Sequence, residues 1–237
     1  MNQKTNLSAK ELQEKSDEIR KKVIEYHKNT KIPHLGCDLS AVEIMTTLYY
    51  SVMKPGNKFI LSKGHSSGLL YTILNDRGLI PDDTYLKLEE HPTLNPAYGI
   101  EATTGSLGHG LSIGLGMALA DRTKSVYVLM GDGECDEGQV WEAVRTASEL
   151  KVKNLVGIVD CNGIQGFKQT DHSQLDARFA AFGCQTARCD GHDCRRLLDA
   201  LSIPTTNSPL IVLANTVKGK GVPGIENQVK SHYVYQG

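Results

Sequence analysis

Two apolar segments rich in β-branched residues, 125–130 and 154–159, are separated by a helical stretch. Two more such segments lie near 184–188 and 210–214, again with helical stretches between them. Apolar strands that alternate with helices are typical of a parallel sheet covered on both faces. A chain of 237 residues suits one large domain. The sequence therefore predicts a single α/β domain over residues 1–237, with three layers and a mostly parallel sheet.

The first half of the chain carries less regular signals. Residues 8–29 have the periodicity of an amphipathic helix, and residues 59–61 form a short apolar strand. The run from Ser40 to Glu43 has the form of a capping box. We therefore expect a helix to begin at Ser40 and to include the apolar residues 44–52.

A segment rich in glycine, proline and threonine, 91–110, predicts a long loop. A glycine-spaced helix is expected directly after it, over residues 111–120. Because Gly114 and Gly116 present no side chain, this helix is expected to pack closely against a neighbouring element.

Composition excludes several classes of protein. Hydrophobic residues make up 40% of the chain, charged residues 22%, and the net charge is -1. These values argue against disorder, nucleic-acid binding and attachment to a membrane surface. The sequence contains no apolar run of the roughly 18 residues that a membrane-spanning helix needs. The polar N-terminal residues resemble neither a secretory signal nor a transit peptide, so a cytoplasmic protein is expected.

Four residues in the second half could be interpreted as a zinc site, namely Cys184, Cys189, His192 and Cys194. Their spacing fits no usual zinc motif, and none of the six cysteines forms a C-x-x-C pair. The preferred interpretation is a strand that carries Cys184 and Cys189, followed by a turn and a helix.

The strongest chemical signal lies where two predicted strands end. Gly131, Asp132 and Gly133 follow one strand, and Asn162 follows the next. Ligands of such sheets bind at the carboxyl ends of the strands, which lie about 5 Å apart. Carboxylate and amide oxygens suit Mg²⁺ or Ca²⁺, and flanking glycines let backbone N–H groups face a diphosphate. The pattern predicts a metal–diphosphate site, although a Gly-Asp-Gly turn alone also fits a plain surface turn.

These residues resemble a known family. The segment GDGECDEGQVWEA at 131–143 closely resembles the corresponding stretch of transketolases, and the spacing from GDG to Asn162 resembles the thiamine diphosphate-binding motif. Further segments resemble the same family in matching order, namely HLGCDLSAVEIMTTLYYSVM (34–53), GHSSG (64–68), HP (91–92), ATTGSLGHGLSIGLGMALA (102–120) and VKGKGVPGIEN (217–227). The resemblance covers nearly the whole chain and implies the pyrophosphate-binding domain of a thiamine diphosphate enzyme.

The resemblance implies how the cofactor and its metal would be held. Asp132, the side chain of Asn162 and the main-chain oxygen of Ile164 would bind Mg²⁺ or Ca²⁺. Gly131 and Gly133 would lie against the diphosphate, with Gly133 in contact with it. The broader motif often has asparagine where Cys161 precedes Asn162, although transketolases vary at this position.

The resemblance also implies which residues surround the reacting groups. Backbone groups of Gly105 and Leu107 would line the aminopyrimidine pocket, and Glu137 matches an acid at the contact between paired active sites. Histidine suits proton transfer because its pKa lies near neutrality. The family's active-site histidines are matched by His34, His65, His91 and His232. Around His34 the sequence reads Pro-His-Leu-Gly, where many transketolases have Gly-His-Pro-Gly.

A complete transketolase is more than twice as long as this chain, and its next domain supplies the glutamate that activates the aminopyrimidine. The resemblance therefore implies the first subunit of a split transketolase, with a second subunit that carries the pyrimidine-binding domain, in an α2β2 assembly. The implied reaction moves a two-carbon ketol unit from a ketose or ketose phosphate to an aldehyde through the cofactor carbanion. Sugar or aldehyde substrates are expected, without nucleic acid or membrane partners.

Two other functions also fit parts of the sequence. The chain could serve another thiamine diphosphate reaction, of the 1-deoxyxylulose-phosphate synthase type or with a 2-oxoacid. It could also be a non-catalytic regulatory relative. The segment 131–143 and the histidines favour a transketolase, and the presence of Asp132 and Asn162 argues against a degenerate relative.

Overall fold

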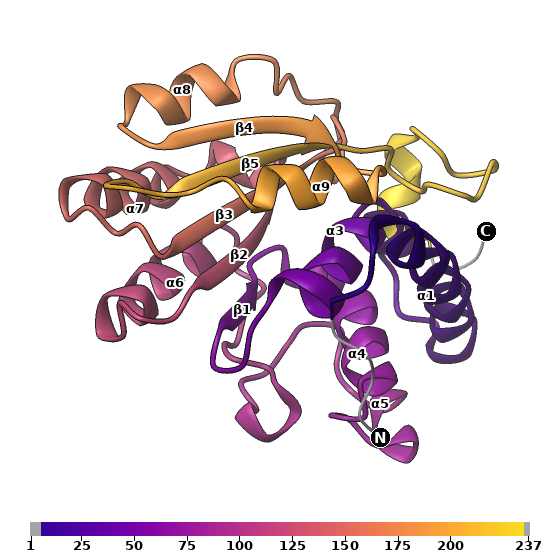
Figure 1. The fold of residues 1–237 in the computed structure, drawn as a ribbon. Coiled ribbons are helices and arrows are strands. Elements are labelled where there is room, and N and C mark those ends of the chain that lie inside the picture. The colour runs from indigo at the N-terminus through magenta and orange to yellow at the C-terminus, as the bar shows by residue number, and fades with distance from the viewer. Residues whose placement is uncertain (1–5, 235–237) are drawn as a thin grey trace.

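The computed structural model describes residues 6–234. Its centre is a five-stranded parallel sheet in the order β1-β2-β3-β5-β4 (Figure 1). The strands are β1 (Lys58–Leu61), β2 (Val126–Gly131), β3 (Leu155–Cys161), β4 (Gln185–Asp190) and β5 (Leu210–Asn215). Each predicted strand is present, with its ends moved by a residue or two. The predicted parallel α/β sheet is confirmed.

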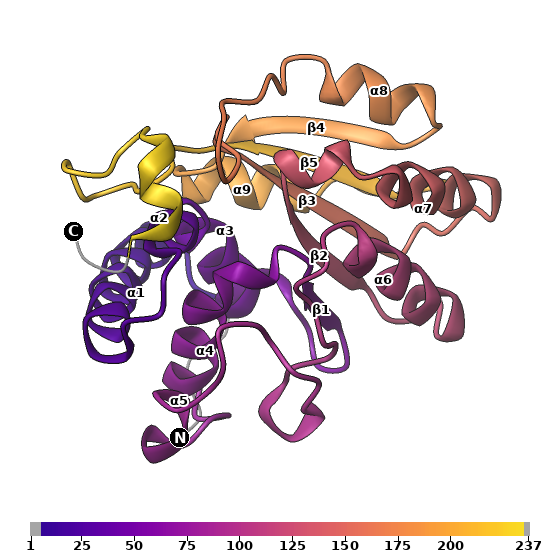
Figure 2. The same cartoon turned by 180° about the vertical axis from the view of Figure 1, so that it is seen from behind.

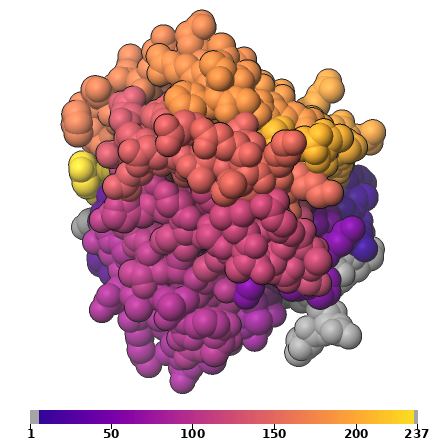
Figure 3. All heavy atoms as spheres, turned by 90° about the vertical axis from the view of Figure 1, so that its left-hand side faces the viewer, coloured from indigo at the N-terminus to yellow at the C-terminus, as the bar shows by residue number. Residues whose placement is uncertain are grey.

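Helices cover both faces of this sheet (Figures 1 and 2). The core on one face includes side chains from α1 (Ala9–Thr30), α2 (Leu35–Ser40), α3 (Val42–Thr47), α4 (Ser67–Asp76) and α9 (Cys194–Leu201). The core on the other face includes side chains from α6 (His109–Ala120), α7 (Gly138–Glu149) and α8 (Leu175–Ala181). Figure 3 shows α8, α7 and α6 one below another on that side of the molecule. The predicted three layers are confirmed.

Alternation along the strands assigns side chains to these two cores. On β2, Tyr127 and Leu129 face the core that contains α1, whereas Val126, Val128 and Met130 face the core that contains α6. Successive side chains of a strand point to opposite faces, so a strand that is covered on both sides is apolar throughout. The continuous apolar pattern of the sequence therefore has its cause in these two cores.

Short elements join the main ones. One more α-helix, α5 (Asp82–Tyr85), follows α4, and a π-helical turn, η1 (Leu48–Val52), continues α3. The 3₁₀ turns are η2 (Gly64–Ser66), η3 (Pro96–Tyr98), η4 (Gly133–Asp136) and η5 (Val229–Tyr233). The predicted loop 91–110 thus contains one 3₁₀ turn.

The expected capping box at Ser40 is wrong. Ser40 is the last residue of α2, and its single O–H lies between two acceptors, the carboxylate of Asp160 at 2.6 Å and the carbonyl of Cys37 at 2.9 Å. Glu43 does not reach back to Ser40, because its carboxylate binds Arg20. A capping box has instead formed at the start of α1, where Ser8 and Glu11 exchange hydrogen bonds. Tertiary partners have therefore overridden the local signal at Ser40.

Helix α6 begins at His109, slightly before its predicted start. A Cβ atom at Gly114 would lie 2.5 Å from the Val128 side chain, so the expected close packing is present there. A Cβ atom at Gly116 would meet nothing within 4 Å, so the same expectation is wrong for Gly116. Gly114 therefore faces the sheet, whereas Gly116 lies on a side of the helix that contacts nothing within residues 6–234.

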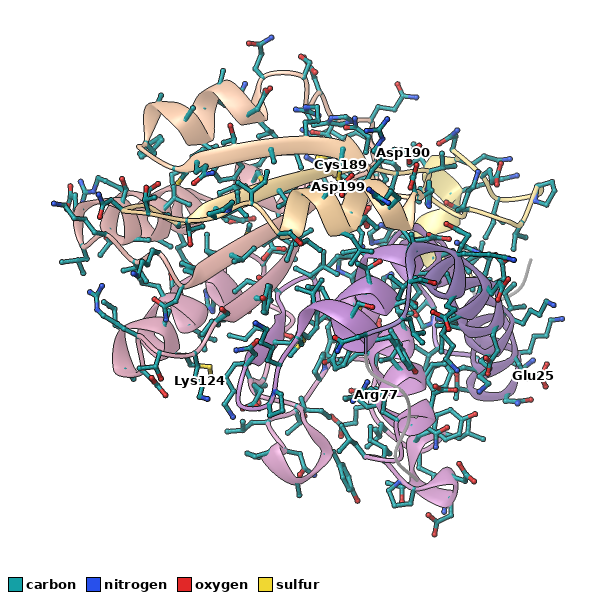
Figure 4. All side chains as sticks on the ribbon, viewed as in Figure 1. Glu25, Arg77, Lys124, Cys189, Asp190 and Asp199 are labelled. Atoms are coloured by element: carbon teal, nitrogen blue, oxygen red, sulfur yellow. The ribbon has the colours of Figure 1, made fainter. Side chains whose placement is uncertain are left out.

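The alternative zinc site does not form. Cys184 belongs to the core beside α7, whereas Cys194 lies in the core on the opposite face of the sheet. His192 contacts the carboxylate of Glu43 and the backbone N–H of Val217 instead of a thiol. Figure 4 shows Cys189 on the outer strand β4. The preferred interpretation of this region, a strand followed by a turn and a helix, matches β4 and α9.

Within residues 6–234, no helix is long and apolar enough to cross a membrane. The longest, α1, has 22 residues and buries only one side. Its buried positions include Leu12, Ile19 and Val23, which follow the helical period.

A buried ion pair fixes α1 to α2. His27 Nε2 lies 2.8 Å from Asp38 Oδ2, and His27 Nδ1 lies 2.7 Å from the carbonyl oxygen of Ile32. Both neighbours accept hydrogen bonds, so both ring nitrogens donate when the imidazole is charged. Burial opposes the charged form, but the hydrogen bond and the charge of Asp38 outweigh it and raise the pKa of His27.

Because the pKa of His27 is raised on folding, its charged form stabilises the protein fully below the unfolded pKa. This stabilisation is lost as the pH rises through the folded pKa. We expect His27→Gln to lower the free energy of unfolding by roughly 1 to 3 kcal/mol at about pH 5.5, and by less at about pH 9. Denaturant unfolding of both proteins at the two pH values measures the difference.

The exposed His109 offers a matched control, because it is a histidine outside both cores. His109→Gln should lower the free energy of unfolding equally little at both pH values. A loss for His27→Gln that is equal at the two pH values, or larger at high pH, contradicts a charged His27.

Candidate active site

The carboxyl ends of the strands surround a cavity of about 330 Å³. Lys63 and His65, which follow β1, line this cavity, and so does Lys218, which follows β5. The predicted site residues that line it are His65, Leu107, Gly131, Asp132, Gly133, Glu137, Asn162, Ile164 and His232. The rule for strand ends predicted Gly131, Asp132, Gly133 and Asn162 of this set, and the family resemblance implied the others.

Asp132 and Asn162 lie at the ends of the neighbouring strands β2 and β3. Asp132 accepts hydrogen bonds from the backbone N–H groups of Gly133 at 2.7 Å and Gly163 at 2.6 Å. Asn162 Oδ1 accepts one from the N–H of Ile164 at 3.1 Å. Asp132 is thereby bound to the backbone next to Asn162, and both side chains line the cavity at the carboxyl ends of the strands.

The carboxylate of Asp132 is buried, with 4% of the residue exposed. Burial raises its pKa, and the nearby charge of Asp160 adds to this. Within residues 6–234, no lysine, arginine or histidine forms an ion pair with it. A buried carboxylate normally has a cationic partner. An oxygen donor of this kind therefore fits a divalent cation as the missing partner.

The turn after β2 is closely packed. A Cβ atom at Gly133 would lie 2.4 Å from the Gln165 side chain, which in turn donates a hydrogen bond to Asp136 at 2.7 Å. A Cβ atom at Gly131 would meet nothing within 4 Å, so the space above Gly131 is open. The predicted approach of a ligand to the backbone is possible on the Gly131 side of the turn.

Three of the four predicted histidines form one cluster. The ring centroids of His34 and His65 lie 5.3 Å apart, those of His34 and His232 4.9 Å, and those of His65 and His232 5.3 Å. His34 Nδ1 also lies 2.9 Å from the carbonyl oxygen of His232. Residues distant in the chain therefore meet at the mouth of the cavity.

Burial and nearby positive charge keep the imidazoles of His65 and His232 neutral. Burial lowers the pKa of His65 well below its ordinary value, and the charge of Lys63 lowers it further. Burial and the charge of Lys218 lower the pKa of His232 to about 3. Burial also lowers the pKa of His34, against the opposing effect of Glu90. Neutral imidazoles can accept a proton from a reacting group.

The fourth predicted histidine lies apart from the other three. His91 packs against Gly105, where a Cβ atom would lie 3.0 Å from the imidazole, and it lines a separate surface pocket. Its neighbour Glu90 does reach the cluster, because Glu90 Oε1 lies 2.9 Å from His34 Nε2. Gly105 and His34 do not line the main cavity either, although Leu107 does.

Two buried lysines, Lys63 and Lys218, also line the cavity, and the sequence analysis did not single them out. Lys218 Nζ donates hydrogen bonds to the Ile164 carbonyl at 3.1 Å and to His232 Nδ1 at 2.9 Å. No carboxylate within the described residues pairs with it, so its charge is available to an anion in the cavity. Lys63 Nζ instead lies 2.5 Å from Asp160. Both follow strand ends, which is the signal that identified Asp132.

Asp160 is completely buried and joins several walls of the cavity. Besides Lys63, its carboxylate accepts hydrogen bonds from Ser40 of α2, from Asn162 at 3.3 Å and from Thr216 after β5. Burial opposes its charge, but Lys63 and these donors outweigh burial and lower the pKa of Asp160. The amide nitrogen of Asn162 is thereby held toward Asp160, so its oxygen faces away.

Comparisons with known proteins agree with this geometry. Residues 12–235 match the family described as "Transketolase, thiamine diphosphate binding domain". The chain is 40% identical to one subunit of the apulose-4-phosphate transketolase of Actinobacillus succinogenes, over 96% of this chain and 92% of that protein. It is 34% identical to a 6-deoxy-6-sulfo-D-fructose transketolase subunit of a Clostridium species, over 94% of this chain and 90% of that protein.

Solved structures show the same fold. The transketolase of Campylobacter jejuni superposes with a TM-score of 0.84 at 25% identity, over 98% of this chain. The chain spans 41% of the length of that transketolase. Family match, similar relatives and the strand-end cavity lead to one conclusion: the chain belongs to the transketolase family, as a thiamine diphosphate-binding domain of the kind found in separate transketolase subunits.

Proposed function

We propose that this chain is the cofactor-binding subunit of a two-component transketolase. In this role it takes part in moving a two-carbon ketol unit from a ketose or ketose phosphate to an aldehyde. The observation that carries the proposal is the cavity at the strand ends. There the carboxylate of Asp132 and the ammonium of Lys218, neither of which has an ion-pair partner among residues 6–234, line the same space. A metal diphosphate satisfies both charges at once.

Different residues of the cavity bind the metal and the diphosphate. Asp132 and the Asn162 side chain bind Mg²⁺ or Ca²⁺, with the Ile164 carbonyl as a third ligand. This carbonyl accepts a hydrogen bond from Lys218, but a carbonyl oxygen has a second lone pair for the metal. The open backbone at Gly131 receives the diphosphate. Bound thiamine diphosphate supplies the nucleophilic carbon for ketol transfer.

The histidine cluster handles protons beside the reacting carbon. His65 and His232 are neutral at pH 7, because burial and the neighbouring lysines depress their pKa values. Each can therefore hydrogen-bond a sugar hydroxyl without adding charge to the site, and Nε2 of His232 is the donor because its Nδ1 accepts from Lys218. His34, oriented by Glu90 and the His232 carbonyl, completes the cluster. His91 lines a separate pocket and is assigned a role at the edge of the substrate path.

A second subunit completes the site. The matching relatives include proteins named as single subunits of a transketolase, and they are similar to this chain along nearly their whole length. The acid that activates the aminopyrimidine is assigned to a partner that carries the pyrimidine-binding domain, in an α2β2 assembly in the cytoplasm. Two aromatic side chains at the cavity, Phe167 and Tyr233, are 80% and 62% exposed. Exposed apolar groups beside a cavity are typical of an interaction surface.

Loss of the metal ligand tests the cofactor site. Asp132→Ala should weaken magnesium-dependent binding of thiamine diphosphate by roughly 100-fold or more in the assembled pair, because the diphosphate then lacks its counterion. Calorimetric titration measures this affinity. Asp121→Ala removes an exposed carboxylate at the opposite end of the sheet and should leave the affinity unchanged. Equal affinity in Asp132→Ala and wild type excludes the metal role.

The partner requirement is tested by an activity assay. The purified chain should show no ketol transfer at any concentration of thiamine diphosphate and Mg²⁺, and addition of the second subunit should restore it. Light scattering should then give the mass of two copies of each chain. Robust activity of the chain alone would overturn the two-component assignment.

A matched pair of variants locates the contact surface. Phe167→Ser removes an exposed aromatic side chain at the cavity, and Leu150→Ser removes an apolar one that is 47% exposed at the end of α7. Phe167→Ser should weaken assembly by roughly tenfold or more, as expected for a central aromatic residue of an interface. Leu150→Ser should leave assembly unchanged. Equal effects of the two variants contradict a contact at the cavity.

A further inference from the structure

The turn after β2 contains a buried carboxylate that the proposed chemistry does not use. Glu134 is 2% exposed and follows directly after Gly133. Its Oε1 atom accepts hydrogen bonds from the hydroxyl of Ser62 and, at 2.8 Å, from the backbone N–H of Gly108. Its Oε2 atom accepts one from the backbone N–H of Gly131 at 3.2 Å. One side chain thus binds three separate segments.

Each of these segments forms part of the cavity wall. Ser62 precedes Lys63, Gly108 follows Leu107, and Gly131 begins the turn that presents Asp132. The three segments come from the end of β1, from the loop before α6 and from the end of β2. Glu134 therefore hydrogen-bonds to three segments of the cavity wall that are separate in the sequence.

The charge of Glu134 also fits this place. Burial raises its pKa, whereas its three hydrogen-bond donors and the nearby Lys63 oppose that rise. Gly108 is the N-terminal cap of α6, where an anion interacts favourably with the helix dipole. Because the carboxylate already accepts the Gly108 N–H, it also holds the first turn of α6 at a fixed distance from the β2 turn.

We propose that Glu134 is a positioning residue that sets the spacing between the diphosphate turn and the opposite wall at Leu107. This inference rests on the proposed placement of the diphosphate at the open backbone of Gly131. Without Glu134, the N–H groups of Gly108 and Gly131 lose their buried acceptor, and the two walls move independently. The cavity then fits the extended cofactor less well, although the folded core remains.

An ordinary buried polar residue elsewhere in the chain gives the matched comparison. Asn154 Nδ2 donates hydrogen bonds to the carbonyls of Ala118, Asp121 and Lys124, at 2.9, 3.1 and 2.8 Å. The two N–H groups of this amide are shared among three carbonyls of one segment, residues 118–124, which lies at the amino end of the sheet, away from the cavity. Asn154 is therefore a buried hydrogen-bonding residue that does not touch the cavity.

The experiment compares Glu134→Ala, Glu134→Gln and Asn154→Ala in the chain assembled with its partner subunit. Measured quantities are the dissociation constant of thiamine diphosphate, kcat at saturating cofactor and the melting temperature. Glu134→Ala should raise the dissociation constant by roughly tenfold or more, since each unsatisfied buried group costs about 1 to 3 kcal/mol. Its kcat at saturation should stay within about threefold of wild type, a split that lost folding alone does not produce.

Glu134→Gln retains an oxygen for Ser62 and Gly108 but places an amide N–H against Gly131, so its dissociation constant should rise by a smaller factor, about threefold. Asn154→Ala should lower the melting temperature without changing the dissociation constant. An unchanged constant in Glu134→Gln contradicts the inference even if Glu134→Ala does not fold. Failure of the wild-type pair to bind thiamine diphosphate would instead contradict the proposed function.

Discussion

The site depends on the buried ion pair between Asp160 and Lys63. Asp160 is buried near the carboxyl end of β3, and its carboxylate lies 2.5 Å from Lys63. It also accepts hydrogen bonds from α2, from the segment after β5 and from Asn162. A buried pair of this kind adds little net stability, but removal of one partner leaves an uncompensated charge at a cost of about 3 to 5 kcal/mol. Its contribution is positional, because Asp160 at the end of β3 binds Lys63 after β1 and Thr216 after β5.

The charges around the cavity follow from that arrangement. Asp160 neutralises Lys63, whereas Lys218 and Asp132, which have no ion-pair partner in the described part of the chain, face the cavity. Burial, together with the charges of Lys63 and Lys218, lowers the pKa values of His65 and His232, so neutral imidazoles lie beside charged groups. Charged groups thus suit the anionic and metal parts of the proposed ligand, and neutral imidazoles suit the reacting part. The charged side chains and the neutral imidazoles therefore line different parts of one cavity at the strand ends.

Sequence reasoning predicted the sheet and the pair of Asp132 and Asn162, because both follow from strand periodicity and from the rule for strand ends. It failed at Ser40, whose hydroxyl binds Asp160 from a distant strand instead of capping a helix. It also missed Lys218 and Glu134. Lys218 follows a strand end as Asp132 does, whereas Glu134 binds Ser62 and Gly108, which lie far away in the chain. The family resemblance identified three histidines that the fold gathers and His91, which lies apart from them.

The central claim is that Asp132 and Asn162 hold a metal ion directly against the cofactor diphosphate. Pulsed electron paramagnetic resonance of the assembled enzyme, with Mn²⁺ in place of Mg²⁺, measures this contact through the coupling of the metal to phosphorus nuclei. Strong phosphorus coupling should appear when thiamine diphosphate is added, and it should disappear when Asp132 and Asn162 are both replaced by alanine. Bound Mn²⁺ without phosphorus coupling, or coupling that survives the double replacement, would contradict the account.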